Sequence, residues 1–218
     1  MAPDVSRSGP TEPLRDPPLG ATWRLPVLDL PTGTRLYRLN STSYPDPAYF
    51  GRDPTFRFNA TDGSFGVCYL ATTLTCALLE TLSISRPIEG PWIVTQTELR
   101  LRYVARAATI RPMRLAYLAD DGLQLLGIDL RVTGGSDYLL SRRWSQAIHG
   151  HAARVDGVFY PSRHHNRLFS VALFERARDA VAFSVWGTLG DPKQRLLWLA
   201  TLRFLRRFDA RLIVDSAK

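Results

Sequence analysis

The sequence has little cysteine, almost no lysine and no long apolar run. Its two cysteines, Cys68 and Cys76, have a spacing that matches no metal or redox motif. We expect them to be reduced core thiols in a cytoplasmic protein. No run of roughly eighteen apolar residues is present, and the polar, proline-rich N-terminus lacks the apolar segment of a secretory signal. These absences argue against a membrane protein and against a disulfide-stabilised secreted domain.

Arginine carries nearly all of the positive charge. The formal net charge is +8, and the lysines are Lys193 and Lys218 alone. Guanidinium groups pair bidentately with phosphates and carboxylates, so an anionic ligand or partner is expected. The basic residues are spread from Arg7 to Arg211 without one dense tract, which disfavours a dedicated nucleic-acid interface.

The chain divides into an N-terminal arm and one folded domain. Residues 1–22 are rich in Pro, Asp, Ser and Arg, with almost no aliphatic pattern, and predict a mobile arm. Residues 23–218 hold the apolar residues that form a core. Hydrophobic residues make up 45% of the chain and charged residues 22%, which is typical of a globular domain.

The periodicity of the domain predicts a mixed α+β fold. Strands are predicted at 34–40, 155–160, 168–174 and 181–186, with a long, half-buried, alternating strand at 92–105. Helices are predicted at 71–82, from Asp120 or Asp121 to Leu126, from an N-cap at Ser136 or Asp137 to Ile148, and at 192–208. Residues 41–54 contain three prolines and predict a loop. No Gly-x-Gly-x-x-Gly loop is present, which disfavours a Rossmann dinucleotide site.

Glu80 lies near the C-terminal end of the helix predicted at 71–82. The apolar residues of this helix gather on one arc, and Glu80 falls on its flank, where it could border a cleft. A carboxylate at this end of a helix is unfavourable by about 0.3–1 kcal/mol. If Tyr69 is also helical, it shares a face with Glu80. On spacing alone, an ordinary solvated glutamate remains the commoner alternative.

Arg38 and Arg57 both lie next to aromatic residues. Arg38 follows Tyr37 in a strand-like run, and Arg57 lies between Phe56 and Phe58. Such an arginine is either on the exposed face of an alternating strand or a positioned anion ligand. The pattern alone favours the exposed face.

Ser162 follows the strand predicted at 155–160. A turn residue is the usual role of a serine in that place, and hydrogen bonding to a ligand is the alternative. The Gly-x-Ser-x-Gly elbow of a hydrolase nucleophile is missing. The four histidines, at 149, 151, 164 and 165, have no acidic partner at a metal-ligand spacing, so no metal site is expected.

Together these motifs resemble the RES domain family, over a core of residues 35–174. The matching positions are Arg38 in Leu-Tyr-Arg-Leu, Arg57 in Phe-Arg-Phe-Asn, Tyr69 in Tyr-Leu-Ala, Glu80 in Leu-Leu-Glu, Asp156-Gly157, Ser162 in Tyr-Pro-Ser-Arg, and Asn166. The resemblance implies an ADP-ribosyltransferase-like fold with mostly antiparallel sheets flanked by helices. It also implies a cytoplasmic toxin that cleaves NAD at its nicotinamide bond.

The resemblance supplies the positions of six site residues, and we assign roles to them as a hypothesis. Catalytic roles fall to Arg38, Glu80 and Ser162, and substrate binding to Arg57, Tyr69 and Asn166. NAD is then the substrate, with no cofactor, and the acceptor is either inorganic phosphate or water. The implied partner is an Xre-like antitoxin, through which alone the toxin would meet nucleic acid.

Two other functions stay open at this point. The same fold supports an ADP-ribosyltransferase that modifies a macromolecule, in which case labelled NAD would mark a polymer. The arginine content also permits a non-catalytic nucleic-acid-binding module, which would show steeply salt-dependent binding.

Overall fold

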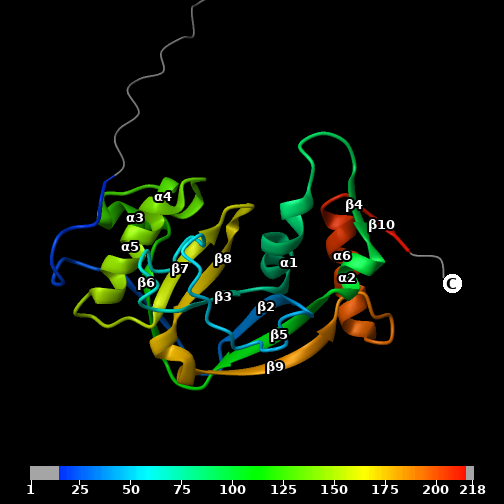
Figure 1. Ribbon diagram of the computed structural model, residues 1–218, viewed down its shortest axis with the longest axis horizontal. Helices are drawn as coiled ribbons and strands as arrows, with labels where there is room; N and C mark the ends of the chain where they lie inside the picture. The colour runs from blue at the N-terminus through cyan, green and yellow to red at the C-terminus, as the bar shows by residue number, and fades with distance from the viewer. Residues whose placement is uncertain (1–14, 215–218) are drawn as a thin grey trace, which may run out of the picture.

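The computed structural model describes residues 15–214, so most of the arm predicted at 1–22 lies outside the described part. Its centre is an eight-stranded sheet in the order β1-β6-β7-β8-β3-β2-β5-β9 (Figure 1). A separate two-stranded sheet pairs β10 with β4. The strands are β1 (Val27–Leu30), β2 (Arg35–Ser41), β3 (Val67–Ala71), β4 (Trp92–Thr95), β5 (Arg102–Thr109), β6 (Met113–Tyr117), β7 (Gly157–Ser162), β8 (His165–Phe174), β9 (Val181–Thr188) and β10 (Ala210–Ile213).

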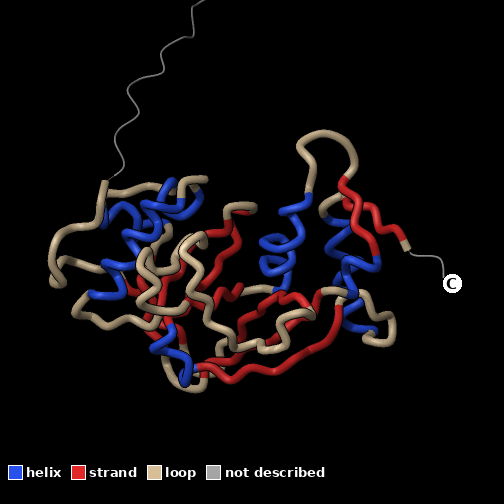
Figure 2. The backbone as a smooth tube through the Cα atoms, in the orientation of Figure 1, coloured by secondary structure: helices blue, strands red, loops and turns tan. Residues whose placement is uncertain are grey.

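The helices gather in two groups that lie apart from each other along the large sheet (Figure 2). The first group is α3 (Asp120–Leu126), α4 (Arg131–Gly134) and α5 (Tyr138–Gly150), beside β6 and β7. The second is α1 (Leu74–Leu82), α2 (Gln96–Arg100) and α6 (Arg195–Arg207), together with the small sheet. Two 3-10 turns, Ser83–Ser85 and Glu175–Ala180, complete the elements. The arrangement confirms the predicted α+β class.

The large sheet is antiparallel except where β6 runs parallel to β7, and it has one weak seam. Strands β2 and β3 pair at a single position, Tyr37 opposite Ala71. Their other neighbours hold them far better, because β3 pairs with β8 over five positions and β2 with β5 over seven. The sheet therefore opens between β2 and β3.

The long strand predicted at 92–105 is wrong, because a short helix interrupts it. Strand β4 ends at Thr95, helix α2 follows, and β5 begins at Arg102. The Thr95 side chain accepts a hydrogen bond from the backbone N–H of Glu98, at 3.0 Å, and so caps α2. Thr-x-x-Glu is a capping signature, so local chemistry prevailed over the alternation.

Other boundaries are partly confirmed. The strand predicted at 34–40 is β2, but β1 precedes it. The helix predicted at 71–82 begins at Leu74, because Ala71 ends β3 and the Thr73 side chain caps the helix by accepting from Cys76 N. Tyr69 is therefore on a strand and not on the helix. Helix α3 is confirmed, as is the Asp137 cap of α5.

Asp156 and Gly157 serve the architecture of the sheet. Both Asp156 carboxylate oxygens accept hydrogen bonds from the Arg111 guanidinium, and one also accepts from the backbone N–H of Arg114. A Cβ atom at Gly157 would lie 2.4 Å from the carbonyl oxygen of Ala172, on the paired strand β8. This motif thus permits β7 to sit against its neighbours.

Three large apolar clusters, and a small one around Cys76, hold the layers together. One joins α3, α4 and α5 to the sheet around Trp144 and Phe58, and a second fills the space around Leu36 and Leu173. The third packs α1 against α6 and β4, with Leu78 and Phe204 among its members. No helix within residues 15–214 has both the length and the apolar character needed to cross a membrane.

Candidate functional site

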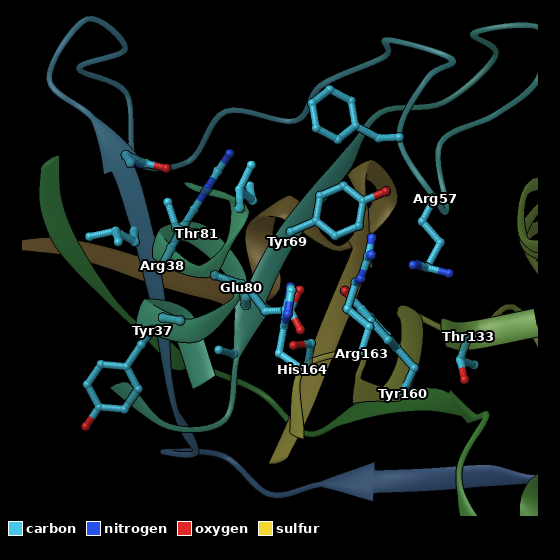
Figure 3. Close-up of a pocket in the computed structure, with 18 of the residues that line it drawn as sticks. Tyr37, Arg38, Arg57, Tyr69, Glu80, Thr81, Thr133, Tyr160, Arg163 and His164 are labelled. Atoms are coloured by element: carbon cyan, nitrogen blue, oxygen red, sulfur yellow. The ribbon is translucent and has the colours of Figure 1, made fainter. Parts of the chain in front are cut away.

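A pocket of about 570 Å³ lies at the seam of the large sheet. Its walls come from β2, β3, α1, the loop around Arg57, the start of α5 and the turn between β7 and β8. Figure 3 shows Arg38 and Glu80 on the same side as α1, with Arg57 and Thr133 opposite. Segments far apart in sequence thus converge where β2 and β3 separate.

Glu80 is the only acidic residue among those that line this pocket. It projects from the last turn of α1 and is half-buried, so it is not an ordinary solvated glutamate. The Ser162 hydroxyl, at the end of β7, donates a hydrogen bond of 2.5 Å to Glu80 Oε1. The same hydroxyl accepts the backbone N–H of His164 at 3.2 Å. Ser162 thereby fixes one carboxylate oxygen, and within residues 15–214 no hydrogen bond forms to Oε2.

Tyr69 connects the pocket floor to the loop above it. Its hydroxyl donates to Asn59 Oδ1 and accepts the backbone N–H of Phe58, both at 2.9 Å. Asn59 in turn donates to the carbonyl oxygen of Asp53 at 2.7 Å. Burial raises the pKa of the Tyr69 hydroxyl above its ordinary value. The hydroxyl is therefore neutral and bonded on both sides, and the ring faces the pocket (Figure 3).

Arg38 is half-buried on β2 and anchors the loop that follows this strand. Its Nη1 donates to the carbonyl oxygens of Pro47 and Tyr49, at 3.0 and 2.8 Å. The same nitrogen lies 3.1 Å from Cys68 Sγ. Arg38 is therefore not simply a solvated side chain on an exposed strand face. It ties the loop to the floor of the pocket.

Arg57 departs further from the expected exposed strand position. It lies in a turn, its side chain is 7% exposed, and Phe56 and Phe58 do not alternate around it as strand residues would. Its Nη1 donates to the carbonyl oxygen of Gly135 at 3.0 Å. Its Nη2 is buried and has no hydrogen-bond partner among residues 15–214. A buried cationic donor without an acceptor is costly, and it is the kind of group that an anionic ligand would satisfy.

Tyr138 and Arg163 complete the wall around Arg57. The Arg57 guanidinium carbon lies 4.2 Å from the centre of the Tyr138 ring, at the first residue of α5. Arg163 Nη1 donates to the Tyr138 hydroxyl at 3.0 Å. Both arginines line the pocket, so this wall carries two positive charges around one ring.

Tyr160 and His164 also line the pocket. No role was predicted for Tyr160, and His164 was considered only as a metal ligand. Burial raises the pKa of Tyr160 well above its ordinary value, and the Glu80 charge adds to the shift. Burial lowers the pKa of His164, and the Glu80 charge opposes this while Arg163 and Arg57 reinforce it. His164 is therefore influenced by charged groups of both signs.

The six residues assigned from the resemblance do not all reach the pocket. Arg38, Arg57, Tyr69 and Glu80 line it, and Ser162 adjoins it through Glu80. Asn166 lies on β8, is exposed, and is not among the lining residues. Both cysteines are buried free thiols, and burial raises the pKa of each to about 11.

Metal ligands do not gather in the described part of the chain. Between residues 15 and 214, no group of three or more His, Cys, Asp or Glu side chains is placed to hold a metal ion. The polar side chains that line the pocket carry guanidinium groups, phenols, aliphatic hydroxyls, one amide, one imidazole and one carboxylate. It suits an anionic organic ligand.

Comparison with known proteins finds relatives in sequence and in fold. The RES domain matches residues 35–199. A "Probable toxin y4kH" of Sinorhizobium fredii is 28% identical over 103 residues, which cover 47% of this chain and 80% of the relative. The M. tuberculosis MbcT–MbcA toxin–antitoxin complex contains a chain of similar fold, with a TM-score of 0.57 and 12% identity. That match covers 80% of this chain and 92% of the other.

Proposed function

Because the chain belongs to the RES domain family, we propose that it is the toxin of a toxin–antitoxin system and that it cleaves the nicotinamide–ribose bond of NAD. The observation that carries this proposal is that the hydrogen-bonded pair of Glu80 and Ser162 faces, across the pocket, a buried Arg57 Nη2 that has no hydrogen-bond partner among residues 15–214. One fixed carboxylate and one unsatisfied cation face the same pocket. A dinucleotide offers a ribose to the first and phosphate to the second.

The reaction fits a pocket with a single carboxylate. The nicotinamide ring of NAD is cationic and leaves as a neutral base when the glycosidic bond breaks. A second carboxyl acting as general acid, as in ordinary glycoside hydrolysis, is not needed. Positive charge develops on the ribose as the bond lengthens, and the Glu80 carboxylate stabilises it electrostatically.

The remaining residues bind and orient the substrate. Ser162 holds the carboxylate through Oε1 and so fixes its direction. Arg57 and Arg163 provide the positive charge for the pyrophosphate or for an inorganic phosphate acceptor. Tyr69 presents a ring face against which a flat base can stack. With phosphate as acceptor the products are nicotinamide and ADP-ribose 1″-phosphate, and with water they are nicotinamide and ADP-ribose.

The proposed partner is an antitoxin that restrains the enzyme. A protein that consumes NAD harms its own cell unless it is held inactive, and the MbcT chain of similar fold is described in a complex with MbcA. An Xre-type partner and action in the cytoplasm, where the NAD pool is, belong to the same proposal. The buried reduced thiols agree with that compartment.

The decisive experiment follows NAD and its products by mass spectrometry. The purified protein is incubated with NAD, with and without phosphate, alongside Glu80→Gln, which keeps the shape of the side chain and removes its charge. We expect nicotinamide release by the wild type and a loss on the order of 100-fold or more in the variant. Circular dichroism checks that the variant is folded.

Two results would contradict the proposal. NAD left intact by the folded wild type would exclude the activity, and equal turnover by Glu80→Gln would exclude the site. Recovery of the ADP-ribose group on a protein or nucleic acid would point instead to the transferase alternative.

A further inference from the structure

Helix α6 presents an exposed face of arginine and leucine that the proposed chemistry does not use. At 100° per residue, its outward arc is roughly 120° wide. This arc contains Arg195, Leu196, Leu199, Arg203, Arg206 and Arg207, which we call the α6 face. The opposite side of α6 packs through Leu197, Phe204 and Leu205 into the cluster that also holds α1. The α6 face therefore lies beyond α1 from the pocket (Figure 1).

The charge of this face is not balanced within the protein. Residues 191–214 include six arginine or lysine side chains against two aspartates. Helix α6 itself contains no acidic residue. Within residues 15–214, none of the arginines of the α6 face forms an ion pair. The guanidinium carbon of Arg207 lies 5.3 Å from the centre of the Phe208 ring. The guanidinium groups of the α6 face are free to pair with an anionic partner.

Helix stability explains only part of this composition. Cations in the last turn interact favourably with the helix dipole, which accounts for Arg206 and Arg207. It does not account for Leu196 and Leu199 near the other end, which are 74% and 39% exposed. They lie three residues apart on one face, where neighbouring side chains contact each other. The α6 face thus has a small apolar part, Leu196 and Leu199, between Arg195 at one end of the helix and a cationic part, Arg203, Arg206 and Arg207, at the other.

We propose that the α6 face docks an acidic amphipathic helix of a protein partner. Apolar residues of that helix would cover Leu196 and Leu199, and its carboxylates would pair with Arg203, Arg206 and Arg207. Arginine around a small apolar centre is the composition typical of protein interfaces. The RES match ends at residue 199, so the cationic part lies outside the region shared with the family.

The same features disfavour the other occupants. Two copies of this chain would bring like charges together, and no acidic residue on the α6 face compensates. Nucleic acid would pair with the arginines but would leave the leucines against a charged backbone. A lipid surface needs a broad apolar face, whereas the apolar side of α6 is buried in the core.

The test uses the full chain and a labelled synthetic peptide that forms a helix with leucines on one face and glutamates beside them. Its scrambled isomer has the same composition and charge. Arg203→Glu with Arg206→Glu reverses the cationic part, and Leu196→Ala with Leu199→Ala removes the apolar part. Arg35→Glu with Arg167→Glu changes the net charge equally at exposed positions on the large sheet.

Fluorescence anisotropy is expected to show binding of the helical peptide, with a Kd on the order of tenfold lower than for the scrambled isomer. Both α6 pairs should weaken binding by a similar factor, and the control pair should not. All variants should still release nicotinamide from NAD at the wild-type rate, so the result is separate from the proposed activity.

Three outcomes would overturn the proposal. One is the lack of peptide binding. Another is equal binding of the scrambled isomer, or equal loss in the control pair, since either would reflect net charge alone. The third is tighter, α6-dependent binding of a mixed-sequence DNA duplex or of phosphatidylglycerol vesicles, which would assign the face to a different partner.

Discussion

The two sides of the pocket use arginine in different ways. On the β2 side, Arg38 directs Nη1 at the carbonyl oxygens of Pro47 and Tyr49, so it organises a loop. On the α5 side, Arg57 has one hydrogen bond, to the carbonyl oxygen of Gly135, and a buried Nη2 with no partner in the described chain. The free N–H groups of a half-exposed guanidinium can donate to water, whereas those of a buried guanidinium need an acceptor from the protein or a ligand. We therefore propose that Arg38, assigned a catalytic role from the sequence, contributes mainly to architecture, and that Arg57 contributes mainly to binding.

The largest effect should come from Arg57→Met, which keeps the bulk of the side chain and removes its charge. We expect kcat/KM for NAD to fall by about 100-fold, because a charged hydrogen bond to the ligand is lost. The free energy of unfolding should stay level or rise, since an unsatisfied buried cation disappears. Steady-state kinetics and urea denaturation measure the two. A large loss of stability with unchanged kcat/KM would reverse the assignment.

Ser162 contacts Glu80 and belongs to neither arginine side of the pocket. Its substitution Ser162→Ala should reduce kcat by about tenfold. The Glu80 carboxylate loses the donor that directs Oε1, while the charge itself remains. KM for NAD should change little, because the substrate-binding arginines are untouched. Ser162→Thr keeps a hydroxyl and should recover part of the rate. Equal loss in the Ala and Thr variants would argue for a packing defect.

Arg38→Met tests the architectural side. Its two hydrogen bonds to backbone carbonyl oxygens hold residues 47–49 against β2, and their loss should lower the free energy of unfolding by about 1–2 kcal/mol. The loop between β2 and β3 should also become more sensitive to limited proteolysis than in Arg57→Met. If the two variants were equally stable and equally resistant, the contrast between the arginines would fail.

Tyr138→Phe should have a smaller effect, about two- to fivefold on KM. The substitution keeps the ring over which Arg57 lies and removes the hydroxyl that accepts from Arg163. Arg163 then becomes less well positioned at the pocket. Tyr138→Ala also removes the ring and should raise KM further. Equal KM values in the Phe variant and the wild type would show that Arg163 acts without this contact.

The smallest effect concerns pH and lies away from the pocket. His149 stacks on Phe65 with ring centres 3.9 Å apart, and burial, with Arg176 and Arg154, lowers its pKa from 6.5 to about 4. Between these two values the unfolded chain takes up a proton that the folded chain does not, so stability falls as pH falls. In the His149→Gln variant, the free energy of unfolding from urea denaturation should decrease less steeply as the pH falls across this range. An identical pH slope would contradict it.

The sequence predicted the elements that carry strong local signals. The Asp137 cap of α5 and the position of α3 follow from short-range chemistry. The strand predicted at 92–105 was wrong because the prediction followed the alternation of apolar and polar residues. It overlooked the Thr95 cap, although the Thr-x-x-Glu signature is visible in the sequence. The short strand β1 and the helix α4 left little pattern, because four residues give too few periods to read.

The sequence allowed most of the site residues to be predicted, but not how they are arranged around the pocket. Family motifs pointed to Arg38, Arg57, Tyr69 and Glu80, and these four line one pocket. No periodicity reveals that Arg57 is buried in a turn, because that depends on Phe58 entering the core beside it. Tyr138 belongs to no motif considered, since it comes to Arg57 only through the packing of α5. Such contacts arise from tertiary structure alone.

The two hydrogen bonds of the Tyr69 hydroxyl limit what this side chain can do for any ligand in the pocket. Its proton is directed at Asn59 and one lone pair receives the Phe58 amide, so the phenol has little left to offer as acid or base. What remains is a flat electron-rich surface held at a fixed tilt. Selection there rests on the shape and planarity of the incoming group, and electron-poor rings profit most from it.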